Sequence, residues 1–212
     1  MITHQTNQLI VFARAPIVGT VKRRLATVIG DRAALEFYRE TLCSLLIRVS
    51  NRAWKLTVAV ASAESVDHPA FASYDTIAQV SGDLGHRMCF ALDCFPSTNR
   101  IIIGSDIPDI EQGHIHEAFD ALLNHDVVFG PAYDGGFWLA GCNAAFEASS
   151  ASGGRFMSKV RWSTSHSLTD TLKSLPESCR VATVRTLADV DDGESYQRFL
   201  QRHGQVCVND GS

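Results

Sequence analysis

Two aspartates follow closely on an apolar segment, Ile101–Ile103, in the stretch Gly104–Asp109 (GSDIPD). Three consecutive branched apolar residues are typical of a central strand that is covered on both faces. A carboxylate at the end of a buried strand needs a partner, and Mg²⁺ or Mn²⁺, which prefer oxygen ligands, would supply one. We therefore predict that Asp106 is a metal ligand. Asp109 follows a proline and is expected to cap a helix that begins near Glu111.

A third aspartate, Asp134, lies in the segment Gly130–Gly136 (GPAYDGG), again after an apolar run. We expect that run to be a sheet neighbour of the strand before Asp106, which would bring the two carboxylates to one edge. Asp134 would then share the metal or orient an acceptor hydroxyl as a general base. The glycines beside it would let a ligand approach the backbone. The alternative is a tight Asp-Gly turn with no chemical role.

Cations gather after the first apolar run, Gln8–Ala13, in a loop that Pro16 and Gly19 keep out of regular structure. A glycine-containing loop with cations after a strand can hold phosphates. The loop matches neither a Walker A sequence nor GxGxxG, so those mechanisms do not transfer. A solvated basic turn is the alternative. The cations concerned are Arg14, Lys22, Arg23 and Arg24.

Another polar cluster, Gly82–Met88 (GDLGHRM), opens a helical pattern. Asp83 is suited to be the N-cap of that helix. The alternative is that this loop faces an anionic or hydroxyl-rich ligand, with Arg87 beside it.

Short apolar runs alternate with amphipathic patterns along the chain, which predicts right-handed crossovers and a largely parallel sheet. In such a sheet, ligands bind at the carboxyl ends of the strands, where the polar residues above fall. The expected strands are Gln8–Ala13, Lys55–Ala61, Thr76–Val80, Arg100–Gly104, Asp126–Gly130, the run after Gly136 and Cys179–Val184; the expected helices are Asp31–Val49, Leu84–Phe95, Ile115–Leu122, Ser165–Ser174 and Glu194–Arg202.

The length and the overall composition of the chain suit one globular domain over residues 1–212. A formal charge of −4 argues against non-specific nucleic-acid binding. No apolar stretch is long enough for a signal segment or a membrane span, so we expect a soluble, cytoplasmic protein. The six cysteines form no CxxC pair, and we expect them reduced and mostly buried, Cys43, Cys89 and Cys142 among them. Residues 148–154 (ASSASGG) are expected to form a mobile loop.

Four ordered segments together resemble an uncharacterised glycosyltransferase-like family of bacteria, the radical-SAM/selenodomain-associated transferase 1 type. Distant similarity extends to the molybdenum-cofactor and phospholactate guanylyltransferases. The chain departs from the family at Val18, Thr20 and Arg23, where proline, a cation and threonine are usual. The matching segments are Phe12–Leu25, Gly82–Met88, Gly104–Asp109 and Gly130–Trp138, with Trp162–Thr164 and Asp189–Asp191 as markers near the C-terminus.

This resemblance implies a GT-A (nucleotide-diphospho-sugar transferase) fold, a three-layer α/β/α sandwich with a mostly parallel mixed sheet. It implies Mg²⁺ or Mn²⁺ as cofactor, with Asp106 and Asp134 as ligands and Asp106, Asp134 and Lys22 as catalytic residues. It also implies Arg14, Gly19, Lys22 and Arg24 as nucleotide-binding residues, and we expect Asp83, Arg87 and Ser105 to take part in the same binding.

Two reactions and one binding role remain open from the sequence. A glycosyltransferase would take a nucleotide-sugar, and a nucleotidyltransferase of the guanylyltransferase kind would take a nucleoside triphosphate and release pyrophosphate. A binding module without turnover is disfavoured, since it would need neither Asp106 nor Asp134. The acceptor, an unknown small molecule, and the oligomeric state are not indicated.

Overall fold

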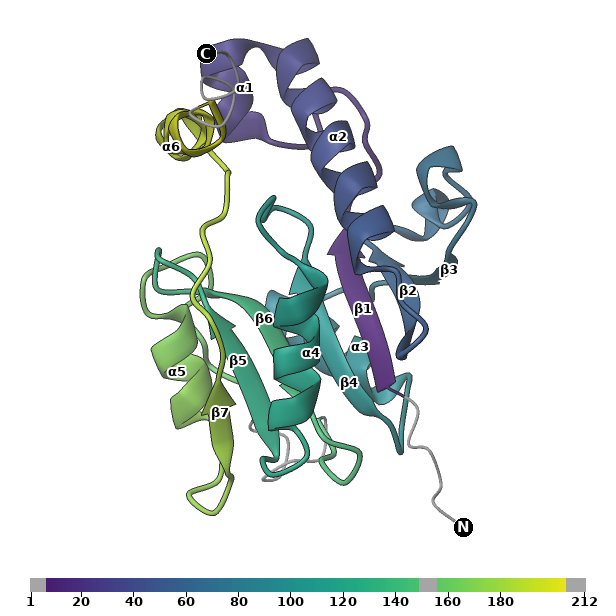
Figure 1. Ribbon diagram of the computed structural model, residues 1–212, viewed down its shortest axis with the longest axis vertical. Helices are drawn as coiled ribbons and strands as arrows, with labels where there is room; N and C mark the ends of the chain where they lie inside the picture. Colours follow the sequence, from purple (N-terminus) through teal and green to yellow (C-terminus); the bar gives the residue numbers. More distant parts are fainter. Residues whose placement is uncertain (1–6, 149–155, 205–212) are drawn as a thin grey trace, which may run out of the picture.

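Seven strands form one sheet at the centre of the computed structural model, which describes residues 7–148 and 156–204 (Figure 1). The strand order is β3-β2-β1-β4-β6-β5-β7, and every neighbouring pair is parallel except the two that involve β6. Each expected strand is present, with ends that differ by one or two residues. The strands are β1 (Asn7–Ala13), β2 (Trp54–Val60), β3 (Asp75–Ala78), β4 (Asn99–Gly104), β5 (Val127–Pro131), β6 (Phe137–Cys142) and β7 (Val181–Thr183).

Consecutive apolar residues in the central strands serve two separate cores. In β1, Leu9 and Val11 join the cluster on one face of the sheet, while Ile10 joins the cluster on the other. In β4, Ile101 and Ile103 likewise join the first cluster, while Ile102 joins the second. Side chains alternate along a strand, so a run that is apolar at every position is buried on both faces.

Helices cover both faces and complete three layers (Figure 1). The long helix α2 and the helix α4 pack on one face, while α3 packs on the other. Helices α1 and α6 contact each other beyond the carboxyl ends of the strands. The helices are α1 (Arg23–Ile29), α2 (Asp31–Val49), α3 (Leu84–Asp93), α4 (Gln112–Ala121), α5 (Ser167–Lys173) and α6 (Gly193–Gly204), with the short 3-10 turns Ala63–Ser65 and Pro69–Phe71.

Two expectations about the aspartates are wrong in detail. The strand before Asp134, β5, is not a neighbour of β4, because β6 returns antiparallel from the intervening turn and pairs with both. The turn still places Asp134 at the same edge of the sheet as Asp106. Asp109 does not cap α4, since the N-cap is Glu111; Asp109 instead pairs with Arg202 and His203 of α6.

The cysteines are less buried than expected. Cys89 and Cys142 are buried, but Cys43 is exposed because it lies on the solvent side of α2. Cys207 lies outside the described residues, as does the expected loop apart from Ala148, which is buried. None of the described helices is both long and apolar enough to cross a membrane.

Candidate functional site

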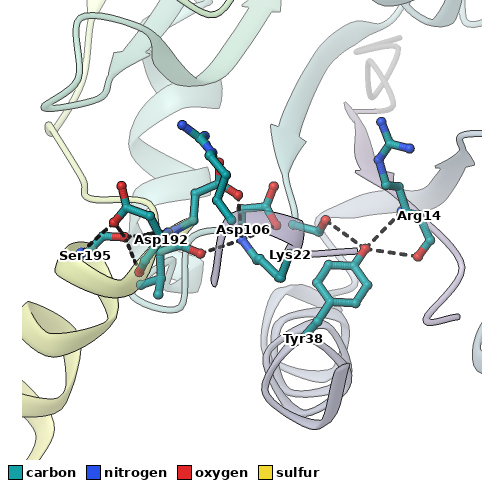
Figure 2. A network of polar contacts seen from close by, with 10 residues as sticks. Arg14, Lys22, Tyr38, Asp106, Asp192 and Ser195 are labelled. Carbon is teal, nitrogen blue, oxygen red and sulfur yellow. Dashed lines mark hydrogen bonds and ion pairs between the residues drawn. The ribbon is translucent and has the colours of Figure 1, made fainter. Parts of the chain in front are cut away.

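Asp106 stands at the carboxyl end of β4 and forms an ion pair with Lys22 (Figure 2). The Lys22 Nζ lies 2.6 Å from Asp106 Oδ1 and donates a 2.5 Å hydrogen bond to the Val190 carbonyl oxygen. It also lies 3.7 Å from Asp191 Oδ1. The Lys22 side chain is 2% exposed, whereas that of Asp106 is 46% exposed. The ammonium is therefore enclosed, and the carboxylate still faces solvent.

The backbone of Lys22 shows that its side chain is held firmly. Its φ of 49° is left-handed, which costs a non-glycine residue about 1 kcal/mol or more. The conformation places the buried ammonium against Asp106 and the Val190 carbonyl oxygen, and these two contacts offset its cost. Lys22 was predicted to bind a phosphate, but in the structure its ammonium is paired with Asp106.

Tyr38 of α2 fixes the other side of the edge (Figure 2). Its hydroxyl accepts the Arg14 N–H at 2.9 Å, donates to the Arg14 carbonyl oxygen at 3.0 Å and lies 3.3 Å from Ser105 Oγ. Burial raises the pKa of Tyr38 to about 12, and the nearby charge of Asp106 adds to the rise. The neutral phenol therefore anchors the loop after β1 beside the end of β4.

Two further carboxylates come from the segment between β7 and α6, which runs along this edge (Figure 1). The Val190 N–H donates to the Asp106 carbonyl oxygen at 3.0 Å, so Asp189 and Asp191 are held on either side of that bond. Burial raises the pKa of Asp189, and the charges of Asp134 and Asp106 raise it further, while Lys22 opposes them. Asp191 pairs with Arg24. From the sequence, Asp189–Asp191 was only a marker of the family resemblance, and no site role was predicted for its two aspartates; the repeated acid was the available signal.

Asp134 lies in the tight turn that joins β5 to β6. Its Oδ1 accepts the Gly136 N–H at 2.8 Å, and the side chain is exposed. Gly135 has a φ of 86°, and a Cβ there would lie 2.2 Å from the Ser165 carbonyl oxygen. Glycine at this position lets the segment before α5 approach the turn. The Asp-Gly turn that the sequence offered as the alternative is therefore present. Asp134 also lines the cavity described next.

A cavity of about 770 Å³ lies at this edge and brings the predicted metal ligands together. Asp106 and Asp134 both line it, together with Asp189, Asp191 and the cation Arg24. The rest of the lining is largely aromatic, apolar and hydroxyl-bearing, and includes Phe12, Leu84, Met88, Ile107, Phe137, Trp138, Trp162, Ser163, Thr164, Ser165 and Ser167.

The remaining predicted nucleotide contacts are not part of that lining. Asp83 caps α3, its Oδ1 accepting the His86 N–H at 2.8 Å. Arg87 donates to Gln79 Oε1, and burial and the charge of Arg14 lower its pKa. Arg14 and Arg87 are therefore neighbours, on the β1 side of the edge. Ser105 is buried beside Tyr38, and Gly19 is exposed with a φ of 75°.

The donor set suits a divalent cation only if the substrate adds ligands. Among the described residues, no group of three or more histidine, cysteine, aspartate and glutamate side chains is arranged to hold a metal ion. Asp106 keeps one oxygen that Lys22 does not contact, and Asp134 lines the same cavity. Mg²⁺ commonly binds one or two carboxylates and completes its shell with substrate phosphates and water. The residues therefore fit an ion that arrives with a diphosphate.

Comparisons with known proteins agree with this architecture. A family profile described as "Uncharacterized protein conserved in bacteria (DUF2064)" matches residues 46–164. The chain is similar to the crystal structure of a "putative nucleotide-diphospho-sugar transferase" from Desulfovibrio desulfuricans G20, with a TM-score of 0.79 at 23% identity over 97% of this chain and 91% of that one. No curated protein matches the sequence.

More distant structures share the fold. A 4-diphosphocytidyl-2C-methyl-D-erythritol synthase from Anaerococcus prevotii DSM 20548 superposes with a TM-score of 0.60 at 11% identity, over 95% of this chain and 99% of that one. The glucosyl-3-phosphoglycerate synthase of Mycobacterium tuberculosis, solved with Mn²⁺, UDP and glucosyl-3-phosphoglycerate, gives 0.54 at 9% identity, over 93% and 76%. These likenesses confirm the predicted GT-A-like α/β fold.

Proposed function

Because the chain belongs to the DUF2064 family of bacterial proteins and has the fold of nucleotide-diphospho-sugar transferases, we propose that it is a metal-dependent glycosyltransferase that uses a nucleotide-sugar. One observation carries the proposal: Asp106 and Asp134, from different loops, line a single cavity of about 770 Å³ at the carboxyl edge of the sheet. Ligands of open α/β sheets bind at that edge. A cavity of this size accommodates a sugar together with part of a nucleotide.

The proposed transfer divides the work between the two aspartates. When bound, Mg²⁺ or Mn²⁺ would neutralise charge on the leaving diphosphate. Asp106 would hold that ion, and the ion pair with Lys22 would position the Asp106 carboxylate. The acceptor hydroxyl oxygen bonds to the anomeric carbon, the bond from that carbon to the diphosphate oxygen breaks, and the diphosphate leaves with the electron pair. The proton of the hydroxyl passes to the carboxylate of Asp134.

The charges of the site favour a nucleotide-sugar over a triphosphate donor. A nucleotidyl transfer must stabilise charge on the α-phosphate and on departing pyrophosphate, which calls for several cations. Lys22 is enclosed by Asp106 and Val190, and Arg24 pairs with Asp191. Both cations are thus already matched by carboxylates. Arg14 and Arg87 pair with no described carboxylate, but they are not part of the cavity lining, so they suit the nucleotide end of a donor on the β1 side and not a departing pyrophosphate.

Ligand-dependent thermal stability tests the proposal. The protein is heated with UDP-, GDP-, CDP-, ADP- and TDP-sugars and with nucleoside triphosphates, each with and without Mn²⁺. A donor at one hundred times its dissociation constant stabilises the fold by about 2.7 kcal/mol, which corresponds to a shift of roughly 5 to 11 °C for a chain of this size. We expect such a shift with one nucleotide-sugar, and only when Mn²⁺ is present.

Two aspartate variants give the matched comparison. Asp106→Asn should abolish the Mn²⁺-dependent shift, whereas Asp120→Asn, on the exposed side of α4, should keep it. A shift with triphosphates alone would favour nucleotidyl transfer. No metal-dependent shift with any donor, or an undiminished shift in Asp106→Asn, would refute the proposal.

A further inference from the structure

One wall of the cavity is aromatic and bears hydroxyl groups. Phe137 and Trp162 pack edge to face, with ring centroids 6.1 Å apart and planes at 70°. The next three residues after Trp162, which are Ser163, Thr164 and Ser165, also line the cavity. Aromatic faces bind apolar C–H surfaces, and hydroxyl groups both donate and accept hydrogen bonds.

The position of this wall is fixed by close packing against α3. A Cβ at Gly85 would lie 2.8 Å from Trp162 Cζ2 and 2.5 Å from the Met157 carbonyl oxygen. Only glycine lets the segment that carries Trp162 approach the helix so closely. The Leu168 N–H also donates to the Gly135 carbonyl oxygen at 3.1 Å, which ties the same segment to the turn that carries Asp134. The aromatic wall and Asp134 are therefore parts of one rigid unit.

The charged residues of the cavity lining carry more negative than positive charge. Four aspartates line the cavity, and Arg24 is the single cation among the described lining residues. Asp106 is paired with Lys22, and Asp191 with Arg24. Asp134 and Asp189 form no ion pair with a described cation, and the charge of Asp134 raises the pKa of Asp189. Like charges repel over several ångströms in a partly solvated cavity, so this end of the cavity disfavours anionic groups.

We propose that the acceptor is a neutral polyhydroxy ring compound, of the sugar or cyclitol class, that packs against Phe137 and Trp162 with its hydroxyl groups toward Asp134 and Asp189. The assignment rests on the proposed transferase function, and it excludes acceptors that carry a phosphate or carboxylate. Carboxylates accept hydrogen bonds from ring hydroxyls, and Asp134 is in place to take the proton of the attacking one. The nucleotide lies on the opposite side of Asp106, toward Arg14 and Arg87.

A matched pair of probes tests the charge selection. The probe 4-nitrophenyl β-D-glucoside is neutral, and 4-nitrophenyl β-D-glucuronide differs from it by one carboxylate. Their dissociation constants are measured with the full-length protein by saturation-transfer NMR at constant ionic strength. One added like charge should weaken binding by about tenfold or more. Asp189→Asn should reduce that ratio severalfold, Asp120→Asn should leave it unchanged, and Trp162→Ala should weaken binding of both probes.

The outcomes separate this inference from the transferase proposal. Equal or tighter binding of the glucuronide overturns it, as does a ratio that Asp189→Asn leaves unchanged. Absence of glucoside binding in a protein that still shows the Mn²⁺-dependent donor shift overturns the acceptor class alone. Glucoside binding without any donor shift overturns the transferase proposal and leaves the polyhydroxy site standing.

Discussion

Replacing Lys22 by methionine removes the buried ammonium and keeps the length of the side chain. Two groups then lose their partner: the Val190 carbonyl oxygen and one oxygen of Asp106. An unpaired buried carbonyl costs about 1 to 3 kcal/mol. Asp106 is 46% exposed and can hydrate, so its lost pair adds only about 0 to 1 kcal/mol. We expect Lys22→Met to lower the free energy of unfolding by about 2 kcal/mol, which is roughly 4 to 8 °C in Tm.

Urea unfolding at pH 7 measures this loss, and two further variants give it meaning. Lys55→Met removes an exposed lysine of β2 and should change stability by less than about 0.5 kcal/mol. In a double-mutant cycle with Asp106→Asn, the pair should show a coupling of about 1 kcal/mol, because the two groups are in contact. If Lys22→Met is as stable as the wild type, or if the cycle gives no coupling, the ammonium does not sit on Asp106 in solution.

Two predictions concern pH. The pKa of Tyr38, about 12, exceeds the usual value of about 10, so its contribution is complete below about pH 10 and is lost as the pH rises through 12. Tyr38→Phe should cost about 1 to 3 kcal/mol at pH 7, because both backbone groups of Arg14 lose a partner, and should remove part of the alkaline loss; an unchanged alkaline slope in urea unfolding would contradict this. Hydrogen bonds from Arg180 lower the pKa of Asp126 to about 2, so that contribution is present above about pH 4 and is lost as the pH falls through 2. The side chains of Asp126 and Arg180 are both partly exposed, so Asp126→Asn should cost less than about 1 kcal/mol at pH 6 and clearly less near pH 2, where about half of the Asp126 carboxyl groups are protonated, as urea midpoints would show; an equal cost at both pH values would contradict the ion-pair origin.

The sheet could be predicted from the sequence because each central strand is apolar at consecutive positions. Ile101–Ile103 serves both cores at once, which no half-exposed strand would require. The helical spacing of apolar residues, three and four apart, predicted both ends of α2 correctly. It did not locate α1, because that helix is short and its start depends on the left-handed Lys22. Nor did it place β6 between β4 and β5, since pairing order depends on contacts along the whole sheet.

The sheet edge that carries the site could be predicted, but the residues that join Asp106 and Asp134 there could not. Asp106 and Asp134 follow strand ends, so the rule for parallel sheets brings them to one cavity. Asp189 and Asp191 follow no strong strand, and they reach the cavity because Val190 bonds to Asp106 across the fold. The hydrogen bond from Lys22 to Val190 spans 168 residues of sequence. Local patterns contain no information at that range.

This long-range pairing changes what the cations of the first loop can do. From their residue types alone, Lys22 and Arg24 are expected to bind phosphate, but each forms an ion pair with an aspartate from another part of the chain. A nucleotide diphosphate that enters the cavity therefore meets carboxylates, which would repel it without a divalent ion. The positive charge for binding must come from Arg14, Arg87 and the metal together. Strict metal dependence of donor binding follows from this charge arrangement, independently of any role that the ion has in the transfer itself.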